Sequence, residues 1–245
     1  MSINVKHIIF FVMVFGILAC NSKQPPANNL NEAQLLQKAS QFASDSKHYS
    51  AINFLELALE KGLDNPMDLV RDNAFYPLID NAEFRAKFRS LLKKYSNSHK
   101  AIMVRDEEPG EHIFVTGEVL DESNQQPIKG ALVELVHTDT NGLYFSEKSM
   151  WNPRIFAYLR TNDKGNFIIE TIYPGSYKDD DGLEVAPHIH FTIEADGYRA
   201  YASEFVFSDD PVFALNGNSE NLPVAKMNVD KGEGNYHVTI NLQSN

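Results

Sequence analysis

The sequence contains one cysteine, Cys20, in 245 residues. An internal disulfide is therefore excluded, and the fold must be held by its hydrophobic core or by a bound metal. Basic residues are fewer than acidic ones, 22 against 33, so the formal net charge is −11. Nucleic acids and anionic lipid surfaces bind cationic proteins, so this balance argues against both as partners. With 43% hydrophobic and 22% charged residues, the composition is that of a globular protein.

The long apolar run of the chain extends from Ile8 to Ala19 and is followed directly by Cys20. It is shorter than the roughly 20 residues of a membrane-spanning helix and has the length of the apolar region of an export signal. Leu18-Ala19-Cys20 resembles the lipobox of bacterial lipoproteins, which implies that Cys20 is lipidated and becomes the new N-terminus. A buried cysteine in an ordinary signal or anchor is the alternative.

We therefore expect residues 1–20 to be a lipoprotein signal peptide and the polar, proline-containing residues 21–30 to be a tether. The expected location is the bacterial cell envelope, with the membrane contacted through the lipid anchor only. Replacing Cys20 with alanine should move the protein from the membrane fraction to the soluble fraction. Fractionation and immunoblotting would measure this, and a variant that stays with the membranes would contradict lipidation.

Residues 31–97 have the apolar periodicity of helices, which begins after Asn31 and ends first near Gly62. These two positions predict an N-cap and a C-terminal cap. A further helical run follows Asp80 and Asn81. Residues 51–95 resemble the last unit of a tetratricopeptide-type array, which implies helix packing or a protein partner. A helical cap on the next domain is the other interpretation.

The chain from 96 to 112 has the composition of a linker, and beyond it the apolar period changes to two. Short strands are separated by Gly, Asn, Asp and Pro, with no helical run between them, so we expect residues 106–245 to form one β-domain. The predicted fold class is α+β in two parts, a small N-terminal α-helical segment followed by an all-β antiparallel sandwich.

The segment "EVAPHIHF" at residues 184–191 places His188 and His190 two residues apart on a predicted strand. Side chains alternate along a strand, so both imidazoles share one face and can converge on one metal ion. An ordinary polar strand face is the alternative. Tyr144 and Tyr177 follow Asn-Gly and Pro-Gly turns after other strands. Phenolate oxygen together with imidazole nitrogen suits a hard, high-valent ion better than it suits zinc.

These segments are similar, in order and spacing, to the catalytic domain of intradiol ring-cleavage dioxygenases, the protocatechuate 3,4-dioxygenase and catechol 1,2-dioxygenase family. The motifs are "GEVLD", "PIKGALVELVHTDTNGLYF", "RTNDKGNFIIETIYPGSY" and "PHIHF". The resemblance extends from about Val115 to Asp210. It implies a β-sandwich in which non-haem Fe(III) is bound by Tyr144, Tyr177, His188 and His190.

The resemblance also implies a reaction, in which O₂ cleaves the ring of a catechol-like small aromatic to a muconate-type diacid. Tyr177 would be displaced by the substrate and take up a proton. One departure concerns the arginine that the family keeps before its histidines, because Val185 stands there. The sequence offers three cations in its place, Lys178, Arg154 and Arg199.

A different class of protein shares part of this pattern. The segment "TGEVLDESNQQPIKGALVEL" also resembles the prealbumin-like sandwich modules of exported bacterial proteins. Under this alternative the protein is a non-catalytic binding module, and its helical segment provides the working surface. The joint presence of two tyrosines and the histidine pair favours the dioxygenase.

Overall fold

The computed structural model describes residues 29–145, 151–216, 222–228, 230, 232 and 234–245. Asn31–Asn245 form one compact unit. The predicted signal peptide and its lipidation site, Cys20, lie outside the described residues. Within the described part of the chain, every helix is too short or too polar to cross a bilayer.

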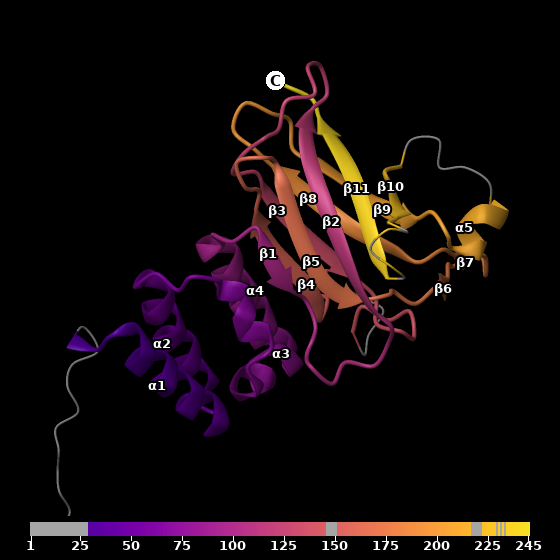
Figure 1. The fold of residues 1–245 in the computed structure, drawn as a ribbon. Helices are drawn as coiled ribbons and strands as arrows, with labels where there is room; N and C mark the ends of the chain where they lie inside the picture. Colours follow the sequence, from indigo (N-terminus) through magenta and orange to yellow (C-terminus); the bar gives the residue numbers. More distant parts are fainter. Residues whose placement is uncertain (1–28, 146–150, 217–221, 229, 231, 233) are drawn as a thin grey trace, which may run out of the picture. The chain divides into compact units, whose positions relative to one another are not determined.

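The N-terminal helices begin where the sequence predicts (Figure 1). Asn31 closes a capping box with Gln34, in which each side chain accepts a hydrogen bond from the other residue's backbone N–H, at 2.9 and 3.0 Å. Gly62 ends the second helix in the left-handed conformation, at φ +99°. Asn81 caps the last helix with its side-chain oxygen. The helical elements are α1 (Glu32–Ser44), α2 (His48–Glu60), η2 (Pro66–Val70), η3 (Asn73–Phe75), α3 (Tyr76–Asp80) and α4 (Ala82–Tyr95).

The rest of the unit is mostly β-structure, as expected. Nine strands form one row in the order β1-β5-β2-β11-β10-β9-β8-β3-β4, and the row bends at β10 into two layers. The end strands β1 and β4 also contact each other, so the sandwich is nearly closed. The strands are β1 (Lys100–Ile102), β2 (His112–Asp121), β3 (Leu132–His137), β4 (Ile155–Arg160), β5 (Asn166–Ile172), β8 (His188–Glu194), β9 (Tyr201–Phe207), β10 (Val224–Met227) and β11 (Asn235–Leu242), with β6 (Tyr177–Lys178) and β7 (Glu184–Val185) as a separate pair.

Three details differ from the sequence-based expectation. The predicted linker contributes strand β1, which pairs with β5. The pairs β1–β5, β10–β9 and β11–β2 are parallel, while the other described pairs are antiparallel. A short helix, α5 (Pro211–Asn216), lies between β9 and β10. Strand direction between segments distant in sequence depends on which end of the sheet the chain enters, and local periodicity carries no information on that.

Helix α4 packs against the outer face of the sandwich. Phe88 is buried, and polar residues on the same helix reach the sheet. The guanidinium of Arg89 lies 3.0 Å from a carboxylate oxygen of Glu134 on β3, and Lys93 lies 3.2 Å from the other oxygen. These contacts support the interpretation of the helical segment as a cap on the β-domain.

Candidate metal centre

The two histidines lie on β8 with the alternation that the sequence predicts. Ile189 and Phe191 point into the core, whereas His188 and His190 share the opposite face. The Nδ1 atom of His188 lies 2.7 Å from the carbonyl oxygen of Ala186. A carbonyl only accepts, so Nδ1 carries the proton and Nε2 keeps its lone pair for a ligand. The two Nε2 atoms are 3.1 Å apart and face each other.

Tyr144 completes a triangle with the two imidazoles. Its phenolic oxygen lies 3.2 Å from Nε2 of His188 and 2.8 Å from Nε2 of His190. Neighbouring ligands that each lie about 2.0–2.2 Å from one ion are spaced about 3 Å apart. The three donors therefore have the spacing of adjacent ligands of a single first-row metal ion.

Tyr177 joins the cluster because two loops touch backbone to backbone. The amide of Gly175 donates to the carbonyl of Asp139 at 3.0 Å, which joins the loop before Tyr177 to the loop before Tyr144. A β-carbon at Gly142 would lie 2.3 Å from the carbonyl oxygen of Ser176, so only glycine permits this approach. The Tyr177 ring centroid then lies 6.3 Å from that of Tyr144 and 5.7 Å from that of His188.

The surroundings set the protonation of these groups in the absence of a cation. Burial, followed by the influence of Tyr177, raises the pKa of Tyr144. Burial also raises the pKa of Tyr177, and its hydrogen bond with Tyr144 lowers it in part. Burial and the neighbouring His188 lower the pKa of His190 to about 4, so this imidazole is neutral at pH 7. Neutral imidazole is the form that binds metals, and a nearby polyvalent cation favours phenolate.

A carboxylate that sequence reasoning missed also lies at this centre. Glu204 on β9 stands directly across from His190, and its Oε2 lies 3.6 Å from Nδ1 of His190 and 3.9 Å from Nε2 of His188. Donor atoms of these three residues lie within 4.8 Å of one another. Glu204 is the one charged residue of β9, and this was the feature of the sequence that could have marked it as a candidate site residue. The pairing register that aligns it with His190 is visible only in the structure.

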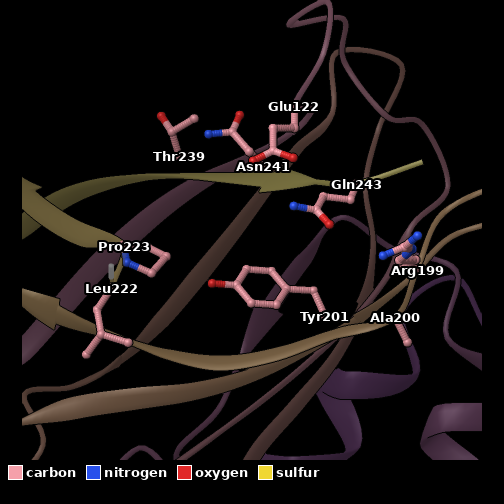
Figure 2. A pocket seen from close by; sticks show the side chains of 9 residues that line it. All are labelled: Glu122, Arg199, Ala200, Tyr201, Leu222, Pro223, Thr239, Asn241 and Gln243. Carbon is pink, nitrogen blue, oxygen red and sulfur yellow. The ribbon is translucent and has the colours of Figure 1, made fainter. Parts of the chain in front are cut away.

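Of the three cations proposed to replace the family arginine, Lys178 is exposed, Arg199 lies in a separate hollow and Arg154 is already paired. Lys178 is exposed on β6, in the register position opposite Glu184 of β7. Arg199 lines a separate hollow of about 550 Å³ at the seam between β9 and β11, as Figure 2 shows. None of the four predicted metal-binding residues lines that hollow. Arg154 is bound to the carboxylate of Glu108.

Arg154 forms a buried ion pair that supports the loop of Tyr144. Both terminal nitrogens of its guanidinium lie 2.6 Å from the two carboxylate oxygens of Glu108, whose side chain is 5% exposed. The backbone N–H of Arg154 donates to the carbonyl of Tyr144 at 2.9 Å. Glu108, in the segment before β2, therefore holds Arg154, and the backbone of Arg154 is in turn hydrogen-bonded to Tyr144.

Replacing Glu108 with alanine should lower the free energy of unfolding by about 3 kcal/mol, because it leaves the Arg154 guanidinium buried without its carboxylate. Chemical denaturation measures this difference. Glu107→Ala is the matched control, since its side chain is exposed beside the same segment. Equal unfolding midpoints for the two variants would contradict a stabilising role for the pair.

The structure is a β-sandwich in which two tyrosines and two histidines lie close together. The family model described as "Dioxygenase" (Dioxygenase_C) matches residues 88–221, more than half of the chain and including the segments that carry the resemblance. The chain belongs to the intradiol ring-cleavage dioxygenase family.

Individual relatives agree with this placement. The chain is 28% identical over 110 residues to the protocatechuate 3,4-dioxygenase alpha chain of Pseudomonas putida, covering 44% of this chain and 54% of the relative. It is 30% identical over 132 residues to the beta chain of the Burkholderia cepacia enzyme, covering 50% of this chain and 56% of the relative. The chain thus spans about half the length of these relatives.

Among solved structures, 3-chlorocatechol 1,2-dioxygenase of Rhodococcus opacus 1CP aligns with a TM-score of 0.49 at 20% identity. The alignment covers 59% of this chain and 64% of that structure.

Proposed function

We propose that the protein is a non-haem Fe(III)-dependent intradiol dioxygenase that cleaves a catechol-type ring with O₂. The observation that carries the proposal is the donor triangle of Tyr144, His188 and His190, with Tyr177 beside it, in a chain of the dioxygenase family. The prealbumin-like module offers no reason for these four side chains to converge.

The donor set fits ferric iron. Two phenols, two imidazoles and a carboxylate supply hard oxygen and borderline nitrogen donors, with no thiolate that would favour zinc or copper(I). Tyr144, Tyr177, His188 and His190 would hold the ion, and it would supply Lewis acidity and a template for a chelated catechol. Glu204 adds negative charge next to the two phenolates, which favours the trivalent state.

Each residue has a part that follows from its place. The Ala186 carbonyl holds the His188 ring in one tautomer, and burial keeps His190 neutral. Tyr144 is 6% exposed and its phenolic oxygen contacts both imidazoles, so it stays in place. Tyr177 is only half-buried, on the two-residue strand β6, and can move aside. Its phenolic oxygen can then accept the proton that an incoming catechol hydroxyl releases.

The visible spectrum tests the proposal. Phenolate bound to Fe(III) absorbs visible light, so the iron-loaded protein should be red-brown and the metal-free protein colourless. Catechol should then shift the band, and oxygen uptake should yield a ring-opened diacid. A protein that takes up no iron would overturn the centre. A coloured protein whose spectrum ignores a panel of catechols would overturn the dioxygenase activity and leave iron binding intact.

We further propose that this enzyme works outside the cytoplasm as a lipoprotein of the cell envelope. Support comes from the apolar run before Cys20 and the polar tether after it. The proposed reaction needs only O₂ and the aromatic substrate, with no organic cofactor or external reductant, so it is compatible with an exported enzyme.

A further inference from the structure

A groove of about 550 Å³ begins at the candidate metal centre and extends over the outer face of the sandwich. We call it the catechol groove, and it is lined by His190, Glu204, Val136, Trp151, Arg89 and Glu134, among others. Of the metal-centre residues, His190 and Glu204 face it. A ring held at the centre would therefore have its substituents in this groove.

The strand register places a second set of charged groups one row away from His190. The first cross-strand row is Val136, His190 and Glu204, and the next along the strands is Glu134, Thr192 and Ala202. Residues two apart along a strand are separated by about 7 Å. A ring substituent that points along the groove consequently approaches the side chain of Glu134.

The positive charge beside this row is already used. Arg89 donates to Glu134 at 3.0 Å, to the phenol of Tyr158 at 3.2 Å and to the carbonyl of Trp151 at 3.5 Å, so all three guanidinium nitrogens have acceptors. Its side chain is 10% exposed, whereas those of Glu134 and Glu204 are 23% and 31% exposed. Lys93, the second cation beside Glu134, is 37% exposed and lies 3.2 Å from both Glu134 and Glu194, so it is paired as well. A ligand therefore meets two carboxylates more readily than it meets the guanidinium.

We infer that the site selects catechols whose ring substituents are uncharged or cationic and discriminates against ring carboxylates. This inference rests on the proposed function and narrows its substrate class. A carboxylate on the ring would be placed near Glu134, whose two neighbouring cations, Arg89 and Lys93, are already paired with carboxylates. A neutral group would meet the apolar wall of Val136 and Trp151, and a hydroxyl or ammonium group could donate to Glu134.

The test uses the full-length, iron-loaded protein and titrates its visible band with catechol, 4-methylcatechol and protocatechuate under argon. An isolated unit charge about 7 Å away, at an effective dielectric constant of about 20, changes binding by more than tenfold, and the ion pairs of Glu134 with Arg89 and Lys93 reduce this effect. We therefore expect protocatechuate to bind at least about threefold more weakly than 4-methylcatechol, and its kcat/KM to fall by at least the same factor. Equal or tighter binding of protocatechuate by the wild-type protein would overturn the inference.

Two matched variants locate the cause. Glu134→Gln removes the carboxylate charge and releases Arg89, so the discrimination should fall at least about threefold. Glu194→Gln is the control, because Glu194 also binds Lys93 at 3.2 Å but does not line the groove. Identical discrimination in both variants would overturn the role of Glu134. If no catechol shifts the band, the proposed function itself fails, an outcome distinct from a band that shifts equally with all three.

Discussion

Replacing His190 with alanine should remove bound iron and the visible band together. Its Nε2 atom lies 2.8 Å from the Tyr144 oxygen and 3.1 Å from Nε2 of His188, so it belongs to the donor triangle itself. Loss of a group that only supports a ligand typically lowers metal affinity by about 10- to 100-fold, and loss of a ligand should exceed this. We expect iron affinity at least about 100-fold lower, measured by metal analysis after dialysis against a chelator.

The control for this variant is another strand histidine. His237 on β11 lies 3.3 Å from Glu118 and has no contact with the candidate centre. His237→Ala should keep its iron and its colour. A His190→Ala protein that is folded, by circular dichroism, and binds iron as well as His237→Ala does would exclude His190 as a ligand.

Replacing Tyr177 with phenylalanine should leave most of the iron bound and reduce turnover by about 10²- to 10³-fold. Three strong donors remain, whereas the group proposed to take up the catechol proton is lost, and proton transfer by a positioned side chain contributes about 10²–10⁴ to a rate. The hydrogen bond between the two phenols disappears as well. The absorption band of the Tyr144 ligand should therefore persist at a shifted wavelength. Oxygen uptake with saturating catechol measures the turnover.

Tyr173 provides the matched control in the same loop. Its phenol donates to Asp210 at 3.3 Å and its ring packs against Phe207, away from the histidines. Tyr173→Phe should retain turnover within a few fold. Full activity in Tyr177→Phe would contradict the proton-accepting role. Complete loss of iron from that variant would instead make Tyr177 an indispensable ligand.

Much of the fold could be predicted because local interactions determine it. The capping box at Asn31 uses atoms three residues apart, and Gly62 ends its helix because glycine tolerates positive φ. Alternation on β8 follows from the geometry of a strand, so the shared face of His188 and His190 could be inferred without a structure. The expected antiparallel order was right only in part, since pairs of strands far apart in sequence include parallel ones.

The candidate site required more than local rules. The position of Tyr144 within 3.2 Å of both imidazoles depends on two loops that meet at glycines, whereas the sequence offered only the turn before each tyrosine and the resemblance to a family. Glu204 was missed because it enters the site through the register between β8 and β9. The ion pair of Arg89 and Glu134 beside the groove was likewise missed, because Arg89 comes from a helix about a hundred residues before the histidine pair.

The helix ends and the strand faces could be inferred from the sequence, because each depends on neighbours within a few residues. Which donors meet depends on the packing of distant segments, which puts Glu204 beside the histidines and Arg154 against Glu108. The tertiary structure also decided the charge of the groove, because Glu134 uses the guanidinium of Arg89. The physical reason is that sheet register and loop contacts are set by the packing of the whole core, which no short segment encodes.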